Sequence, residues 1–262
     1  MTSRLPLQAR SESLAQRFAL ARARRTPLDT LPEDARPANQ DEAYAAQFAT
    51  LDLLQEAVAG WKVGAKSPDG AAQCAPLPAS CVHRSGAQLA RREFGKAGLE
   101  LELAFSLGRR FEPAGAPYTD QQVLDSIESV HAAIEIVSSR FNAWPNVDKL
   151  WQLADLQNHG ALIVGEGVAY QRLIDGGFSF ETPAMRFTLD GAAVFDGTPG
   201  NPAGDPRWLL PWLVNHGISR GVIFEPGTVL TTGSYTGMFF PDTAGVLHGA
   251  IEGLPPVQLT LT

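Results

Sequence analysis

The stretch Gly-Leu-Glu-Leu-Glu-Leu-Ala-Phe at residues 98–105 decides both the fold and the site that this sequence predicts. Its apolar residues alternate with Glu100 and Glu102, which is the pattern of a half-buried strand. Because successive side chains leave a strand on opposite faces, the two carboxylates share one face. Neighbouring carboxylates repel unless a positive charge lies between them, and an oxygen-rich pocket suits a hard divalent cation. The alternative is an edge strand with leucines facing the core and glutamates facing water, which is the ordinary arrangement for such a stretch alone.

The composition favours a globular protein that handles a small molecule. The chain has 262 residues, of which 44% are hydrophobic and 19% are charged. Its net charge of −7, without a basic stripe, argues against a nucleic-acid partner. No apolar run approaches the roughly 20 residues of a membrane helix. Cys74 and Cys81 lack the spacing of a zinc site and do not make a disulfide framework. We therefore expect a cytoplasmic protein without membrane or nucleic-acid partners.

Residues 1–60 are expected to form a helical arm that lies against the main body. One helix is predicted over residues 11–25, and a second over residues 41–59, where Gly60 would end it. The N-terminus is richer in arginine than in acid, as a transit peptide would be. Apolar side chains such as Phe18 also suit a docked helix, which is the interpretation we favour.

Residues 61–262 are expected to form a β-rich catalytic domain, continuous with the arm, so that the chain belongs to the α+β class. Short apolar runs broken by Gly and Pro predict strands, together with a hairpin about Asp190-Gly191. Thr119 and Gln122 match a capping box. The predicted strands are residues 61–66, 98–105, 133–138, 161–164, 228–234 and 257–261; the hairpin is 187–195, the helices are 119–131 and 206–216, and 67–88 is a loop.

A third acidic residue, Glu135, occurs inside the apolar run of residues 132–137. A carboxylate buried among such residues destabilises the fold by several kcal/mol unless it is paired or bound to a metal. A partner such as Arg140, or a solvent-facing edge, is the alternative. Together with Glu100 and Glu102 it could supply half of an octahedral Mg²⁺ or Mn²⁺ shell, leaving positions for water and substrate.

Three further groups of polar residues are candidates for the same site, although each is also typical of an ordinary surface. Lys62 lies between Trp61 and Val63 in a segment flanked by Gly60 and Gly64, where the backbone can approach a ligand closely, and it could bind a carboxylate or transfer a proton. Asp155, Asn158 and His159 form a polar cluster before an apolar strand. The run Gly-Ser-Tyr-Thr-Gly at 233–237 offers hydroxyls and N–H groups that could cradle a carboxylate.

The order of these segments resembles the 2-keto-4-pentenoate hydratase/4-oxalocrotonate decarboxylase family, within the fumarylacetoacetate hydrolase-like superfamily. The resemblance runs from about residue 10 to the C-terminus. The matching segments are Ala-Tyr-Ala-Ala-Gln at 43–47, Gly-Trp-Lys-Val-Gly at 60–64, Glu-Leu-Glu at 100–102, Ala-Ile-Glu-Ile-Val at 133–137 with Ser139-Arg140, Leu-Ala-Asp at 153–155, and Thr-Thr-Gly-Ser at 231–234 with Thr236-Gly237.

The resemblance implies a β-rich roll around a divalent cation, Mg²⁺ or Mn²⁺, in a homo-oligomer. It implies substrates that are 2-hydroxydienoates or 2-oxo-enoates from aromatic meta-cleavage catabolism. The 2-oxo acid would chelate the cation, which stabilises an enolate while water adds to the conjugated alkene. The implied metal ligands are Glu100, Glu102 and Glu135; the implied catalytic residues are Lys62, Asp155 and His159; the implied substrate-binding residues are Ser234, Thr236 and Gln47.

Two departures from the family pattern bear on the reaction. Family hydratases carry Asp-Asn-Ala-Ser-Ser where this chain has Asp-Leu-Gln-Asn-His at 155–159, and an acidic residue is absent near Ala79. His83 or His159 could replace that acid, because imidazole titrates near neutrality. The expected function is a metal-dependent lyase that hydrates a 2-oxo-enoate to a 4-hydroxy-2-oxo acid. Alternatives are a decarboxylase of a 2-oxo-dioate and a non-catalytic metal-binding homologue. Hydrolysis of a C–C bond in an acylpyruvate is a further alternative, but the N-terminal arm argues against it.

Overall fold

A computed structural model describes residues 7–197 and 199–262, so the first six residues of the predicted arm lie outside the described residues. The helices are α1 (Leu7–Arg24), α2 (Gln40–Leu54), α3 (Asp120–Leu124), α4 (Lys149–Ala154), α5 (Tyr170–Asp175) and α6 (Leu209–Ile218). The strands are β1 (Val58–Gly64), β2 (Gln73–Pro78), β3 (Val82–Arg84), β4 (Ala87–Leu89), β5 (Gly98–Leu107), β6 (Ile127–Val137), β7 (His159–Ala169), β8 (Met185–Leu189), β9 (Ala192–Gly197), β10 (Val229–Ser234), β11 (Gly245–Ile251) and β12 (Val257–Leu261). The predicted α+β class is confirmed.

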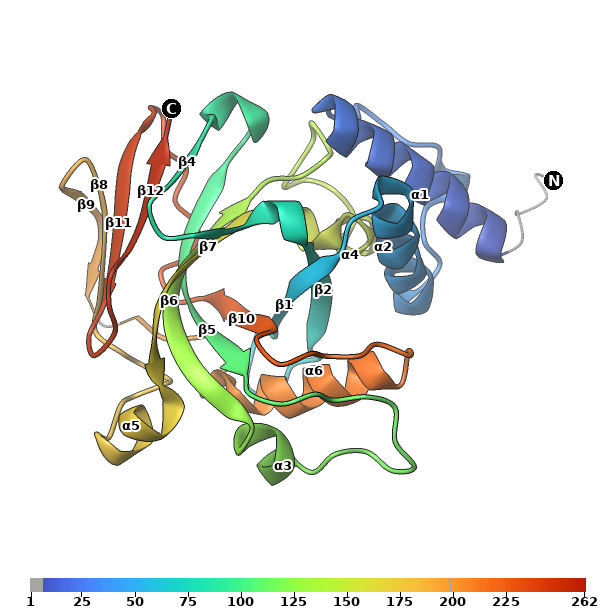
Figure 1. Cartoon of the computed structure of the whole chain (residues 1–262). Coiled ribbons are helices and arrows are strands. Elements are labelled where there is room, and N and C mark those ends of the chain that lie inside the picture. Colours follow the sequence, from blue (N-terminus) through green and yellow to red (C-terminus); the bar gives the residue numbers. More distant parts are fainter. Residues whose placement is uncertain (1–6, 198) are drawn as a thin grey trace.

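Seven strands form a large, strongly curved sheet in the order β2-β1-β10-β5-β6-β7-β3 (Figure 1). Its two edge strands, β2 and β3, are joined in the chain by a single 3₁₀ turn, Ala79–Cys81. The sheet therefore rolls until its edges approach each other. Small and branched side chains from four strands fill the inside of this roll: Leu77, Ala104, Ala133 and Leu162.

A smaller sheet, in the order β4-β12-β11-β8-β9, covers the outer face of the roll (Figure 1). The packing is close, because a Cβ added at Gly249 would lie 2.5 Å from Cδ1 of Leu101. The leucines of β5 thus face the small sheet and are fully buried. Glu100 and Glu102, on the opposite face, point into the roll. The strand is central, which excludes the alternative of a surface edge.

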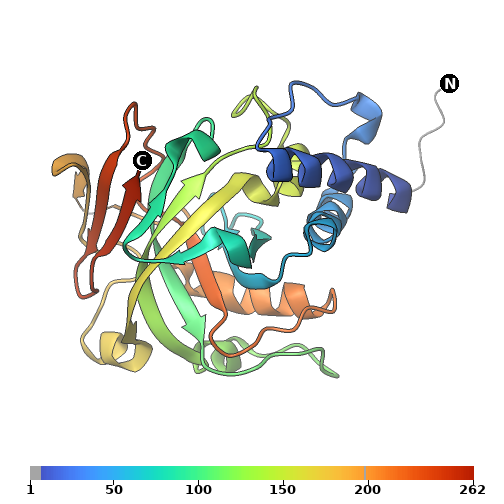
Figure 2. The same ribbon diagram turned by 45° about the horizontal axis from the view of Figure 1, so that its top comes forward.

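The helices α1 and α2 lie across the large sheet from the small one (Figure 2). Asn39 caps α2 by accepting a hydrogen bond from the N–H of Glu42. The helix ends at Gln55, whose left-handed φ of 56° closes it, five residues before the predicted stop at Gly60. Strand β1 therefore begins at Val58, so the expected boundary at residue 60 falls inside a strand. The division into arm and body stays a prediction.

The predicted hairpin is confirmed, but the helix predicted over residues 119–131 and the loop predicted over residues 67–88 are wrong in part. The hairpin turns at Asp190 and Gly191, both with positive φ, as the shortest hairpins require. Both capping-box bonds at Thr119 are present, but α3 ends at Leu124. From Ile127 onward the predicted helix belongs to β6, whose residues pair with β5 and β7. The predicted loop 67–88 contains β2 and β3.

Within the described part of the chain, no helix combines the length and the apolar character that crossing a membrane requires.

Candidate metal centre

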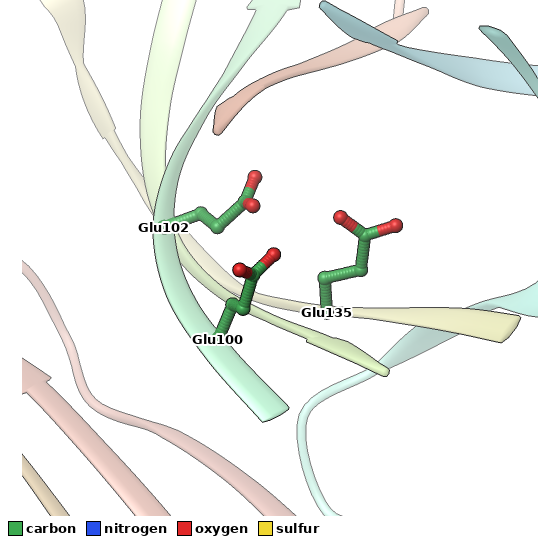
Figure 3. A group of neighbouring side chains, drawn as sticks. All are labelled: Glu100, Glu102 and Glu135. Atoms are coloured by element: carbon green, nitrogen blue, oxygen red, sulfur yellow. The ribbon is translucent and has the colours of Figure 1, made fainter. Parts of the chain in front are cut away.

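Three glutamates converge inside the roll from two neighbouring strands (Figure 3). Glu100 on β5 stands directly opposite Glu135 on β6 in the antiparallel register. Glu102 lies two residues further along β5 and shares their face. One carboxylate oxygen from each residue lies within 4.8 Å of the others. The strand pairing alone therefore builds the three-carboxylate cluster.

Each of the two fully buried carboxylates has one oxygen held by the protein and one without a partner. Oε2 of Glu102 accepts bonds from the hydroxyl of Thr231 and, at 3.1 Å, from the N–H of Gly233. Oε1 of Glu135 accepts from Lys62 Nζ at 2.5 Å and from His159 Nδ1 at 2.9 Å. Oε1 of Glu102 and Oε2 of Glu135 are buried without a donor in the described structure. Unpaired buried acceptors are rare, and a hard cation supplies what they lack, so these residues fit a divalent metal.

The charge state of the cluster supports this fit. Burial, and then repulsion from Glu135, raise the pKa of Glu100 to about 7 and that of Glu102 to about 8. Burial also opposes ionisation of Glu135, but Lys62 and His159 outweigh it and hold the pKa of Glu135 below its usual value. Among the residues that the structure describes, Lys62 is the one ammonium group that pairs with these three carboxylates. A second positive charge is needed before all three can ionise at neutral pH.

Lys62 and His159 flank Glu135 in different charge states. Burial lowers the pKa of the Lys62 ammonium, but the three glutamates together raise it above its usual value, so Lys62 stays protonated. Burial lowers the pKa of His159 to about 4, so its ring is neutral. We assign the proton to Nδ1, which donates to Glu135. His159 therefore orients the carboxylate, as the outer partners of metal ligands do.

A strained turn brings two residues to the cavity: Asn158, which belongs to the predicted polar cluster, and Gln157, which the sequence did not predict. Leu156, Gln157 and Asn158 have φ angles of 50°, 50° and 58°, in a left-handed region that side chains disfavour. The turn brings the carbonyl of Gln157 to Lys62 Nζ at 3.4 Å. Asparagine adopts this conformation more readily than most residues, but leucine and glutamine do not, so the sequence contains no signal for it at Leu156 and Gln157.

A cavity of about 770 Å³ opens over the cluster, within the size range of small-ligand sites. Lys62 and the three glutamates form part of its lining. Trp144, Val137 and Met238 contribute apolar surface, while Lys66 and Lys149 contribute exposed ammonium groups. The cavity therefore combines a charged floor, an apolar wall and a cationic rim.

The residues predicted to bind substrate occupy different places. Ser234 lines the cavity, in register with Glu102, and its hydroxyl donates to the carbonyl of Gly237 at 3.2 Å. The Thr236 hydroxyl accepts from the N–H of Leu101 at 3.2 Å, so it ties its loop to β5 and is not part of the lining. Gln47 is fully buried and donates to the carbonyls of Cys74 and Leu153. Its amide joins α2 to the body and does not reach the cavity.

Two other predicted participants also lie away from the cavity. Asp155 is fully buried and takes an ion pair from Arg22 at 3.0 Å and a bond from the N–H of Arg140 at 2.7 Å. A carboxylate held in this way anchors α1 to the turn after α4 and does not face the substrate space. His83 lines a separate cavity, so it does not supply the acid that is absent near Ala79.

The structure is a β-roll with three carboxylates clustered inside it, and comparisons with known proteins identify its family. The model of the fumarylacetoacetate (FAA) hydrolase C-terminal family matches residues 46–256. The chain belongs to this family, as the resemblance predicted.

Individual relatives are more distant. A 2-keto-4-pentenoate hydratase of Paraburkholderia xenovorans is 25% identical over 252 residues, covering 88% of this chain and 85% of the relative. A 2-hydroxyhexa-2,4-dienoate hydratase of Comamonas testosteroni is 25% identical over 188 residues, covering 71% of this chain and 69% of the relative. These two relatives are hydratases by name.

Solved structures share the fold. The 4-oxalocrotonate decarboxylase of Pseudomonas putida, complexed with magnesium and adipate, has a TM-score of 0.83 over 99% of this chain and 100% of its own, at 16% identity. A fumarylpyruvate hydrolase of Pseudomonas aeruginosa, in complex with Mn²⁺ and pyruvate, has a TM-score of 0.55 at 15% identity. The match covers 77% of this chain and 88% of the hydrolase. Proteins of this fold thus catalyse different reactions, and the fold alone does not identify the reaction of this chain.

Proposed function

We propose that this protein is a divalent-metal-dependent lyase that hydrates a 2-hydroxydienoate or 2-oxo-enoate to a 4-hydroxy-2-oxo acid. The observation that carries the proposal is the cluster of Glu100, Glu102 and Glu135, with two unpaired buried oxygens, beside a protonated Lys62. The names of the two hydratase relatives support the choice of reaction.

The three glutamates would hold Mg²⁺ or Mn²⁺, both of which prefer carboxylate oxygens. When bound, the cation would supply a Lewis acid that stabilises negative charge on the 2-oxo acid end of the substrate. The metals in the related structures, magnesium and Mn²⁺, support this assignment.

Lys62 is the residue that we propose to act on the substrate. Its ammonium lies at the cavity floor, 2.5 Å from Glu135, and is 14% exposed. Because its pKa is raised, Lys62 donates a proton or a hydrogen bond in the resting protein and does not act as the base. Ser234, at the same floor, can donate a hydrogen bond to a substrate carboxylate.

His159 and Asp155 are proposed to position the site without touching the substrate. His159 fixes the carboxylate of Glu135, and Asp155 fixes the helix α1 through Arg22. Gln47 and Thr236 hold the elements from which the cavity is built.

The test is turnover of 2-hydroxypenta-2,4-dienoate with Mg²⁺. Turnover is measured by the loss of the diene absorbance and by identification of the hydrated product. Glu102→Gln should abolish turnover, whereas Glu128→Gln should not, since Glu128 is exposed on β6. If the parent protein with Mg²⁺ leaves the diene and its longer relatives unchanged, hydratase activity on these substrates is rejected.

A second candidate is a metal-dependent decarboxylase of a 2-oxo-dioate. The observation that favours it is the pair Lys66 and Lys149, which line the cavity and have no acidic partner among the described residues. Two free ammonium groups suit a second substrate carboxylate. Release of CO₂ from a 2-oxo-dioate, without net uptake of water, would select this reaction over hydration.

A non-catalytic metal-binding homologue would behave differently from both enzymes. Calorimetry with Mg²⁺ and oxalate, which mimics the chelating end of a 2-oxo acid, would show binding, while a panel of 2-oxo acids would show no turnover. The homo-oligomer and the cytoplasmic location stay predictions, and light scattering of the purified protein tests the first.

A further inference from the structure

A second cavity, of about 330 Å³, lies apart from the metal centre and shares no lining residue with it. It opens between the C-terminal end of α1, the turn from β2 to β3, and the first residues of β7. Its lining includes Arg22, Arg140 and Cys81. None of these residues has a role in the proposed reaction.

The inner wall of this cavity carries more positive than negative charge. Arg22 and Arg140 both approach the single carboxylate of Asp155, at 3.0 Å and 3.7 Å. Their side chains are only 9% and 12% exposed. Burial, together with the charge of Arg22, lowers the pKa of Arg140 to about 10, so the Arg140 guanidinium remains charged at neutral pH. One carboxylate therefore balances two buried cations.

Each of these arginines also has an N–H that lacks an acceptor. Both donate to the carbonyl of His159, at 3.2 Å and 3.4 Å, which fixes their orientation. Nε of Arg22 and Nη2 of Arg140 are nevertheless buried without a hydrogen-bond partner in the described structure. An unpaired buried donor destabilises the fold, and it does so more when it belongs to a charged group than when it belongs to a neutral group. Two such donors on neighbouring guanidinium groups make a natural oxyanion site.

The acidic residues on the cavity wall are already engaged by other groups. Glu56 accepts from the hydroxyl of Ser80 at 2.5 Å, and Glu93 pairs with Arg25 at 2.7 Å. Both pairs are more exposed than the side chains of Arg22 and Arg140. We propose that this cavity binds a small oxyanion, a carboxylate or a phosphate group, between Arg22 and Arg140.

The reactivity of the Cys81 thiol can report on binding at this site, and this measurement does not depend on the proposed lyase activity. The chain has two cysteines, and Cys74 is only 1% exposed, so Cys81 is the thiol open to a reagent. It lines the same cavity, close enough to Arg140 to contribute to the pKa of that guanidinium. An anion bound beside Arg140 should therefore shield Cys81 from alkylation.

The experiment measures the rate at which N-ethylmaleimide, an uncharged reagent, labels the native full-length protein by mass spectrometry. Inorganic phosphate and acetate are titrated separately against chloride at equal ionic strength, and Cys81→Ser confirms the labelled position. An anion at roughly ten times its dissociation constant should slow labelling about tenfold. Protection by phosphate identifies a phosphoryl ligand, and protection by acetate identifies a carboxylate.

Arg140→Met should remove the protection, while Arg25→Gln should keep it, because Arg25 lines the same cavity but is exposed and paired with Glu93. Arg140→Lys retains a charge without the fork of donors, so it should weaken the protection even if the methionine variant does not fold. If labelling with phosphate and with acetate equals labelling with chloride throughout the titration, the cavity holds water only and the proposal is wrong.

Discussion

Replacement of Glu102 by glutamine should stabilise the metal-free protein at alkaline pH and remove its stabilisation by Mg²⁺. The substitution removes one negative charge at nearly constant volume. The amide oxygen can still accept the bonds from Thr231 and Gly233, so the strand geometry should survive.

The magnitude follows from the pKa of Glu102, which burial raises to about 8 from an ordinary value of 4.5. Between these two values the folded state binds more protons than the unfolded state. The free energy of unfolding of the parent therefore falls as the pH rises through this window, and the full loss is on the order of 5 kcal/mol. Glutamine has no carboxyl proton, so the metal-free variant avoids this loss.

The metal should act in the opposite direction. A ligand that binds only the native state adds about 2.7 kcal/mol at 100 times its dissociation constant. The parent should gain this stability from Mg²⁺, because the cation neutralises the cluster. The variant lacks one of the three carboxylates and should gain little.

Urea unfolding at about pH 5 and about pH 9, with EDTA or with Mg²⁺, measures both effects. Glu128→Gln, at an exposed position of β6, is the matched control and should behave as the parent does. Two results would refute the reasoning: equal Mg²⁺ stabilisation of the variant and the parent, or a metal-free parent whose stability, relative to the variant, does not fall with rising pH.

Three further substitutions test separate roles. Lys62→Met should lower kcat by about 10²- to 10⁴-fold while Mg²⁺-dependent stabilisation persists, because proton transfer is lost and the ligands remain; equal kcat would contradict the role of Lys62. His159→Phe should weaken Mg²⁺ affinity by about 10- to 100-fold in a calorimetric titration, since Glu135 loses its outer partner; unchanged affinity would remove His159 from the site. Gln47→Leu should lower the free energy of unfolding by roughly 1–3 kcal/mol with KM unchanged, because two buried carbonyls lose their donor; a raised KM would instead restore the predicted contact with substrate.

The sequence predicted that the carboxylates of Glu100 and Glu102 lie together because strand periodicity alone places them on one face. It did not show that Glu135 stands opposite Glu100, since register between strands depends on the whole sheet. The apolar run around Glu135 nevertheless indicated burial, and burial of a carboxylate indicates a partner. Both inferences rest on local physics, which explains their success.

Residue type did not distinguish polar groups that face the cavity from those that hold the fold. Asp155 and Gln47 both belong to segments that resemble the family. Asp155, however, is buried between α1 and the turn after α4, and Gln47 is buried between α2 and the body. Gln157 reaches Lys62 only because of a left-handed backbone that no glycine signals. Such placements depend on tertiary contacts, which no local pattern encodes.

The central claim is tested most directly by diffraction from crystals of this protein grown with Mn²⁺ and oxalate, measured where manganese scatters anomalously. We expect one strong anomalous peak in the cavity, at coordination distance from Glu100, Glu102 and Glu135, with oxalate on its open side. An anomalous peak elsewhere, or density showing these three carboxylates bound only to water, would contradict the proposed metal centre.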